Sequence, residues 1–263
     1  MNRMVDLVAD VGEGFGDYRI SDDASLLELV SSANVACGFH AGDPRIMDTT
    51  VARCIAQGVS IGAHPGFPDL VGFGRRAMDL TAEEVRTDVL YQIGALSAFV
   101  RSRGATLAHV APHGRLGNLS WTKPSYADAI ADAVLAFDPS LIVLSQEGEL
   151  ARAARERGLK VGILGIGDRA YRDDGTLVPR TEHGAVIHDP QEVAARTVRM
   201  VTEGLIESVS GTDLPVTVDT VLLHGDNPAA LTVARQVRSE LEVAGVEIRP
   251  VAAILKSRAQ VHS

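Results

Sequence analysis

The chain has 263 residues, of which 46% are hydrophobic and 22% are charged, and its formal net charge at pH 7 is −9. The charge argues against nucleic acid or an anionic membrane as partner, because both bind basic surfaces. No stretch approaches the roughly 18 apolar residues of a membrane span, and Asp6 and Asp10 interrupt any signal-peptide core. Two cysteines are too few for a disulfide framework. These features predict a soluble, cytoplasmic protein.

Short β-branched or apolar runs alternate with longer helical patterns along the chain. The runs predict strands at 4–10, 34–39, 59–64, 106–111, 140–145, 160–165, 219–224 and 246–251. Such alternation is typical of repeated βαβ units and therefore of an α/β protein with a largely parallel sheet. The strands mix Val, Ile, Leu and Ala without clean alternation, which indicates a sheet that is buried on both faces.

The helices between these strands carry recognisable ends. Asp43-Pro44 is typical of an N-cap followed by a first-turn proline, and the same pattern recurs at 189–190 and 227–228. Thr81 followed by Glu84 predicts a capping box. These signals place helices after the strands, as a parallel sheet requires.

One domain explains the chain better than two. No linker, low-complexity run or repeat divides it, and the longest irregular piece lies near 166–188. We expect residues 1–255 to form a single domain with an excursion, such as a hairpin or lid, near 166–188. Residues 256–263 are expected to be a C-terminal tail.

Polar side chains follow most of the predicted strands. They are Asp10 and Glu13 after the first strand, His40 and Asp43 after the second, His64 after the third, His113 after the fourth, Asp168 and Arg169 after the sixth, and His224 and Asp226 after the seventh. In a parallel sheet the strand carboxyl ends share one side, and in a closed barrel they share one mouth. Taken singly, each residue has a structural explanation, and Asp43 and Asp226 are better explained as helix caps. Together they predict one site.

Several longer motifs resemble a known family. The strings "DLVADVGEG", "SSANVACGFHAGD", "GVSIGAHPGFPD", "FGRRAM", "YQIGAL", "HVAPHG", "DRAYRDDGTLVPR" and "LLHGDN" are similar, in order, to the LamB/YcsF family of lactam-utilisation proteins. The resemblance covers residues 4 to about 250. It implies a seven-stranded (β/α) barrel related to polysaccharide deacetylases. It also implies ATP-dependent opening of 5-oxoproline to L-glutamate, performed as one subunit of a 5-oxoprolinase with two partner subunits.

This activity assigns chemistry to the predicted site. ATP would phosphorylate the lactam oxygen, and water would then attack the activated carbon with the help of a general base. The catalytic candidates are Asp10, His40, His64 and His113. The substrate-binding candidates are Glu13, Asp43, Arg75, Asp168, Arg169, Arg180, His224 and Asp226, in which the arginines would hold a carboxylate or phosphate. Whether ATP binds this chain or a partner, and whether the chain self-associates, is left open.

The chain also departs from the family pattern. The resemblance implies lysine where Ala111 stands, asparagine at Val8, glutamate at Leu164 and tyrosine at Gly117. Removing one member of a buried Lys–Glu pair costs about 3–5 kcal/mol, whereas replacing both with apolar groups is often neutral. We expect Val8, Ala111 and Leu164 to line one apolar patch inside the barrel. If the absent lysine normally neutralises a phosphate or oxyanion, its absence puts ATP-dependent lactam opening by this chain in doubt.

Two other functions compete with the family activity. An aspartate after the first strand and histidines from later strands can hold a divalent metal, and the candidates are Asp10, His64 and His113, with His40 close by. That arrangement would make the protein a metal-dependent amide or deacetylase-type hydrolase with altered specificity. The third hypothesis is a non-catalytic paralogue that keeps the fold and binds the partner subunits.

Overall fold

The computed structural model describes residues 3–223 and 229–261, in which strands and helices alternate. The strands are β1 (Met4–Val11), β2 (Ser32–Ala36), β3 (Ser60–His64), β4 (His109–Val110), β5 (Ile142–Ser145), β6 (Lys160–Ile166), β7 (Leu205–Glu207), β8 (Asp213–Pro215), β9 (Thr220–Leu223) and β10 (Glu247–Ile248). The helices are α1 (Asp23–Leu27), α2 (Pro44–Gln57), α3 (Ala82–Ser102), α4 (Gly114–Thr122), α5 (Pro124–Phe137), α6 (Glu149–Glu156), α7 (Pro190–Thr202), α8 (Ala230–Val243) and α9 (Val251–Val261). Within the described ranges, none of these helices has the length and apolar character that a membrane crossing requires.

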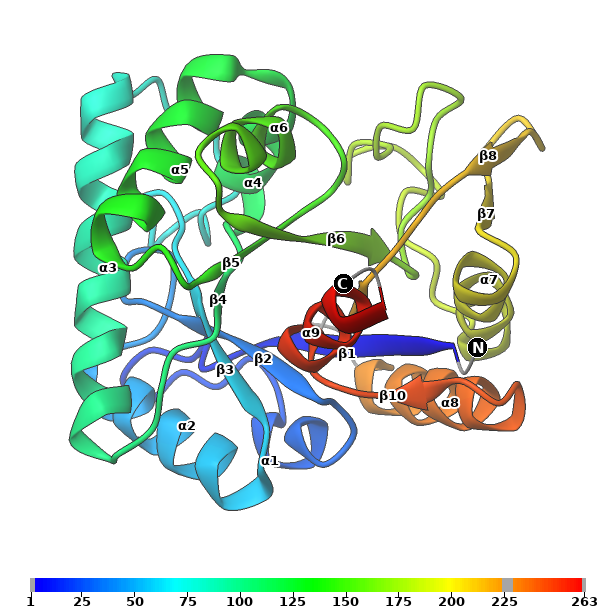
Figure 1. Ribbon diagram of the computed structural model, residues 1–263, viewed down its shortest axis with the longest axis horizontal. Coiled ribbons are helices and arrows are strands. Elements are labelled where there is room, and N and C mark those ends of the chain that lie inside the picture. The colour runs from blue at the N-terminus through cyan, green and yellow to red at the C-terminus, as the bar shows by residue number, and fades with distance from the viewer. Residues whose placement is uncertain (1–2, 224–228, 262–263) are drawn as a thin grey trace.

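Seven parallel strands close into a barrel. Their order is β1-β2-β3-β4-β5-β6-β9, and β9 pairs back onto β1. Strand β10 pairs with the first residues of β1. Helices surround the strands on the outside (Figure 1). The predicted parallel (β/α) barrel with outer helices is therefore confirmed.

The alternation of side chains along β1 shows how the barrel is filled. Leu7 and Val11 belong to the main core between the strands and the helices, whereas Val8 belongs to a small cluster with Ile166 and Leu222. Successive side chains of a strand point to opposite faces. Asp10, which is two residues beyond Val8, therefore shares the inner face and reaches the mouth of the barrel.

The expected single apolar patch inside the barrel is corrected to two clusters. Leu164 packs against the cluster of Val8, as expected. Ala111, however, packs with Ile142, Leu144 and Val251 in a separate cluster. The reason is that Ala111 follows β4, whose neighbour in the barrel is β5, whereas Leu164 comes from β6 and faces β9 and β1.

The helix ends confirm the capping predictions. The Asp43 carboxylate caps α2 by accepting hydrogen bonds from the backbone N–H groups of Arg45 and Ile46. Thr81 and Glu84 form the capping box of α3, and the Asp189 side chain caps α7. The helix start predicted at 227–228 lies outside the described residues.

Two features distinguish the last third of the chain. Residues 167–189 form an irregular segment after β6, and strands β7 and β8 pair as an antiparallel hairpin outside the barrel.

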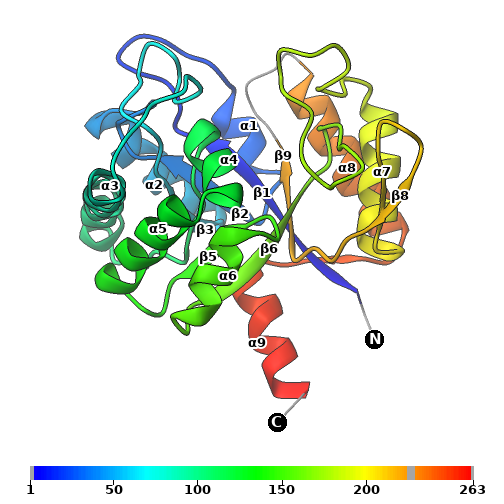
Figure 2. The ribbon, with the colours of Figure 1, turned by 90° about the horizontal axis from the view of Figure 1, so that it is seen from above.

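Helix α9 lies at the end of the barrel where the strands begin (Figure 2). Its first residue, Val251, is fully buried against the inner cluster of Ala111. This helix therefore closes the end of the barrel opposite the strand carboxyl ends.

Tyr126 ties helix α5 to the segment before α3, and its loss should lower stability. The buried Tyr126 hydroxyl donates to the Leu80 carbonyl at 2.8 Å and accepts from the Leu80 N–H at 3.0 Å. We expect Tyr126→Phe to lower the free energy of unfolding by about 1–3 kcal/mol, because two backbone groups lose their partner. Urea denaturation measures this loss. The control Tyr91→Phe, at an exposed ring, should change stability by less than about 0.5 kcal/mol.

Candidate functional site

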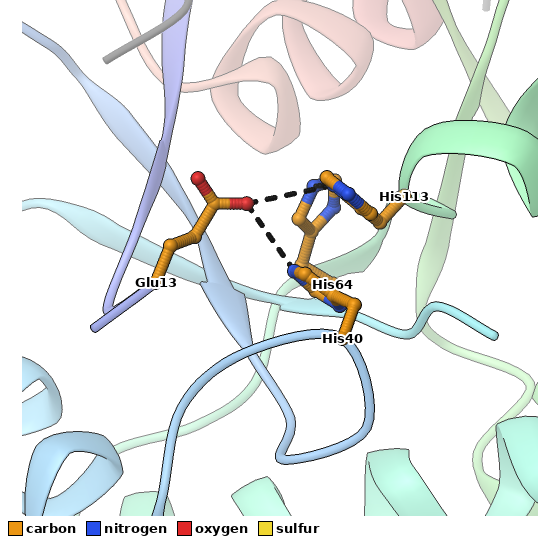
Figure 3. A group of neighbouring side chains, drawn as sticks. All are labelled: Glu13, His40, His64 and His113. Atoms are coloured by element: carbon orange, nitrogen blue, oxygen red, sulfur yellow. Dashed lines mark hydrogen bonds and ion pairs between the residues drawn. The ribbon is translucent and has the colours of Figure 1, made fainter. Parts of the chain in front are cut away.

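Four buried side chains meet where the strands end (Figure 3). Glu13 follows β1, His40 lies in the loop after β2, His64 is the last residue of β3, and His113 stands directly before α4. One ligand atom from each lies within 4.8 Å of the ligand atoms of the other three. Because each residue follows or ends a different parallel strand, the barrel itself brings them together.

The contacts within this group are close. Glu13 Oε1 lies 3.2 Å from His40 Nε2 and 3.5 Å from His113 Nδ1. His64 Nε2 lies 3.0 Å from His113 Nδ1 and 3.2 Å from Asp10 Oδ1. The rings of His40 and His113 are stacked with their centroids 3.8 Å apart. Two carboxylates and three imidazoles therefore share one small volume.

Backbone carbonyls fix the proton on two of the imidazoles. His64 Nδ1 lies 2.6 Å from the Ala111 carbonyl oxygen, and His113 Nε2 lies 2.9 Å from that of Phe73. A carbonyl only accepts hydrogen bonds, so these two ring nitrogens donate. In the neutral rings, the unprotonated nitrogens, His64 Nε2 and His113 Nδ1, then face each other and the carboxylates.

The loop that supplies the Phe73 carbonyl is itself held in an unusual conformation. Phe73 has a φ of 54°, in the left-handed region that non-glycine residues seldom adopt. The next residue, Gly74, has a φ of 63°, and a Cβ there would lie 2.8 Å from atoms of both His113 and His40. The loop thus packs its backbone directly against the two histidines, and strain of this kind is common at functional sites.

Burial keeps these histidines uncharged. The pKa of His40 and the pKa of His113 are both well below the usual range, first because the rings are buried and then because of neighbouring imidazoles. A neutral imidazole nitrogen is the form that binds a metal ion. The electrostatics of the group therefore suit a bound cation.

A pocket of about 660 Å³ opens beside the group. Asp10, His64 and His113 line one side of it, whereas Glu13 and His40 lie behind them. Its lining also includes five arginines and several apolar side chains: Arg75, Arg115, Arg169, Arg172 and Arg180, with Leu144, Leu164, Ile166 and Leu222. A small molecule with an anionic end and an apolar body fits these walls.

One of these arginines, Arg169, uses part of its guanidinium to bind the backbone. Arg169 Nε and Nη2 donate to the carbonyls of Ala185 and Val178, which belong to the irregular segment. Burial, and next the charge of Arg180, lower the pKa of Arg169 to about 10. Arg75 lies over the Phe73 ring at 4.9 Å from its centroid. Arg169 therefore braces the segment 167–189 at the mouth of the pocket.

The structure brings together the predicted catalytic residues. Asp10, His40, His64 and His113 all lie in this region, and Glu13, predicted for substrate binding, joins the three histidines. Asp10, predicted as a metal ligand, contacts His64 but is outside the group of four. Arg75 and Arg180 line the pocket.

Of the remaining predicted residues, Arg169 lines the pocket, whereas Asp43 and Asp168 are not among its lining residues. The Asp43 carboxylate is engaged by backbone N–H groups of Gly16, Arg45 and Ile46. Asp168 is buried, and its charge acts on Arg169. His224 and Asp226 lie outside the described residues.

Sequence reasoning missed two buried polar residues below the site. Asn34 Nδ2 donates to Asp10 Oδ1 at 2.9 Å, and His109 Nε2 lies 2.8 Å from Asn34 Oδ1. The sequence around β4 did carry a signal, because His109 and Ala111 are two positions apart and therefore share the inner face of the barrel. Asn34 likewise stands on the inner face of β2.

Comparisons with known proteins agree with the motifs. The LamB/YcsF family model matches residues 5–256. A 5-oxoprolinase subunit of Heliobacterium modesticaldum is 49% identical over 93% of this chain and 97% of its own length. The lactam utilization protein from Thermus thermophilus has a crystal structure with a TM-score of 0.89 at 49% identity, covering 94% of this chain and 99% of that one.

The barrel also resembles a more distant enzyme. A T48 deacetylase solved with substrate matches with a TM-score of 0.52 at 16% identity, covering 97% of this chain and 92% of that one. At this identity the likeness shows the fold alone. The predicted deacetylase-like fold of the barrel is therefore confirmed.

Proposed function

Because this chain belongs to the LamB/YcsF family, we propose that it is a hydrolase subunit that opens the amide bond of a lactam, 5-oxoproline, together with partner subunits. The names of its relatives support the substrate and the need for partners. The observation that carries the chemistry is the convergence of Glu13, His40, His64 and His113 beside a pocket that Asp10 also lines.

The four residues fit a divalent metal ion. The imidazole nitrogens of His64 and His113 that face each other at 3.0 Å have their partner nitrogens committed to carbonyls. Unprotonated nitrogens and carboxylates repel one another unless a cation lies between them. Tetrahedral ligands about 2.1 Å from one ion lie about 3.4 Å apart, which is close to the observed 3.0–3.5 Å contacts. Backbone acceptors of this kind commonly orient metal-binding histidines.

We assign separate roles in the reaction to residues of this chain. A bound ion would act as a Lewis acid toward the amide carbonyl. Asp10, on the pocket side of His64, is placed to accept a proton from the attacking water. Arg75, Arg115 and Arg180 offer charge-assisted hydrogen bonds to the substrate carboxylate, and the apolar wall at Leu164 contacts the lactam ring.

The finer proposal is that hydrolysis is ATP-dependent and yields L-glutamate. An unstrained lactam is a poor electrophile, and phosphorylation of its oxygen would activate it. The arginines of the pocket support this step, because guanidinium groups bind phosphate as well as carboxylate. The competing proposal, a metal-dependent amide hydrolase that needs no ATP, is favoured by the four-residue group itself.

Metal analysis tests the metal proposal. Protein purified without a histidine tag should contain a stoichiometric divalent metal, and His64→Ala should lose it. His183→Ala, at an exposed histidine in the segment 167–189, is the matched control and should retain the metal. Bound metal is measured by elemental analysis. A protein that binds no divalent ion and still turns over would contradict the metal proposal.

The turnover assay combines the chain with its partner subunits and 5-oxoproline, with and without ATP. Glutamate formed only with ATP supports ATP-dependent hydrolysis, and amide hydrolysis without ATP supports a metal-dependent hydrolase that needs no ATP. No turnover of 5-oxoproline under either condition, in a complex that has assembled, would contradict 5-oxoproline as the substrate, and no turnover of other amides as well would indicate a non-catalytic paralogue.

A further inference from the structure

A chain of three side chains runs down the inside of the barrel from the candidate site. Asp10 Oδ1, at the mouth, accepts a hydrogen bond from Asn34 Nδ2 at 2.9 Å. Asn34 Oδ1, one layer lower, lies 2.8 Å from His109 Nε2. The residues are 5%, 1% and 0% exposed, respectively, so water does not compete for these contacts. The three come from β1, β2 and β4.

Charge fixes the direction of the hydrogen bonds in this chain. If the Asn34 amide were reversed, its oxygen would face the Asp10 carboxylate, and two acceptors would meet in a dry interior. Asn34 therefore presents its NH₂ group to Asp10 and its oxygen to His109. His109 must then carry its proton on Nε2, because only a donor can bind that oxygen.

The surroundings of His109 agree with this assignment. Its other nitrogen, Nδ1, is buried and meets no hydrogen-bond partner in the described part of the chain. An unprotonated Nδ1 loses less without a partner than an N–H donor would. Burial also lowers the pKa of His109 to about 3, so the ring is neutral.

The barrel also makes room for this histidine. Gly62 stands on the neighbouring strand, directly paired with His109. A Cβ at position 62 would lie 2.0 Å from His109 Nε2, far closer than van der Waals contact allows. The imidazole therefore occupies the space that a side chain on β3 would fill. The lack of a side chain at Gly62 therefore leaves the space in which His109 contacts Asn34.

We propose that Asn34 and His109 are positioning residues, which hold the Asp10 carboxylate in one orientation toward His64 and the pocket. This inference rests on the proposed function in so far as Asp10 is the base. With one oxygen anchored by Asn34, the carboxylate cannot rotate away from the pocket when substrate binds. Neither positioning residue lines the pocket, so neither is expected to touch the substrate.

Kinetics of the assembled enzyme test the proposal. We expect Asn34→Ala and His109→Leu each to lower kcat by about 10–100-fold with little change in KM, as is typical when a supporting hydrogen bond is removed. His109→Gln should recover most of the rate, because its amide N–H can reach Asn34. Ser32→Ala is the control, since Ser32 is buried on the same face of β2 but takes part in neither contact of Asn34.

Equal losses in His109→Gln and His109→Leu would overturn the proposal, because they would show that the shape of the ring matters and not its donor. Unchanged kcat in a folded Asn34→Ala variant would overturn it as well.

Two measurements that do not depend on turnover separate this proposal from the proposed function. ¹⁵N spectra of histidine-labelled protein should show His109 protonated on Nε2 and bare on Nδ1. A crystal structure of Asn34→Ala should show the Asp10 carboxylate turned away from His64. The reverse tautomer, or an unmoved Asp10, would overturn the positioning chain even if lactam hydrolysis is confirmed. Both expected results would support the chain even if 5-oxoproline is not the substrate.

Discussion

Replacement of Asp10 with asparagine is expected to lower the rate of amide hydrolysis by about 10²–10⁴-fold, which is the range for loss of a general base. Asparagine has nearly the same shape and can still accept the hydrogen bond from Asn34. The residues proposed to hold the metal, Glu13 and three histidines, are unchanged. We therefore expect Asp10→Asn to retain its metal and its stability while losing kcat. Steady-state kinetics measure kcat, elemental analysis measures the bound metal, and urea denaturation measures the stability.

Asp43→Asn is the matched control for this substitution. It makes the same chemical change in a carboxylate that caps α2, and asparagine is as good an N-cap as aspartate. Its kcat should equal that of the unmodified protein. Turnover by Asp10→Asn within a few-fold of the control would show that another group accepts the proton.

Replacement of Asp6 with asparagine is expected to stabilise the protein above pH 6. Asp6 is fully buried on the inner face of β1, and burial raises its pKa from 3.8 to about 6 despite the hydrogen bond from the Ser31 hydroxyl. Between these two pKa values the unfolded chain releases the proton and the folded chain keeps it. Stability therefore falls as the pH rises from about 4 to about 6, and the loss then remains.

The size of this effect follows from the shift. At 1.36 kcal/mol for each pKa unit, a change of about two units corresponds to about 3 kcal/mol at pH 7. The asparagine side chain is neutral at every pH and lacks this penalty. Urea denaturation should give nearly equal stabilities for the two proteins at pH 4 and a variant that is more stable by up to about 3 kcal/mol at pH 8. A difference that is independent of pH would show that Asp6 does not titrate in this window.

The sequence predicted the alternating helices and parallel strands because their signals are local, whereas the closed seven-stranded barrel was implied by the family resemblance. Asp43-Pro44 and the Thr81–Glu84 pair mark helix starts within a few residues, and apolar runs mark buried strands. The convergence of His40, His64 and His113 then followed from the topology, since parallel strands all end on one side. That residues 1–255 form one domain, and that the protein is cytoplasmic, remain predictions.

The contacts inside the site were beyond such reasoning. Asn34 and His109 meet across 75 positions of sequence, and nothing near either residue indicates the other. The role of Glu13 depends on Gly12, whose φ of 70° turns the chain back after β1. Arg169 lines the pocket, as its predicted role in substrate binding requires, but the sequence does not indicate that two of its N–H groups donate to backbone carbonyls.

The placement of the chain ends has a practical consequence. Strand β1 begins, and helix α9 extends, at the end of the barrel opposite the strand carboxyl ends (Figure 2). The candidate site lies at those carboxyl ends. A surface anchor or fluorescent label attached through either terminus would therefore leave the pocket entrance facing solution. Immobilised protein can accordingly be used to titrate small molecules on a sensor chip.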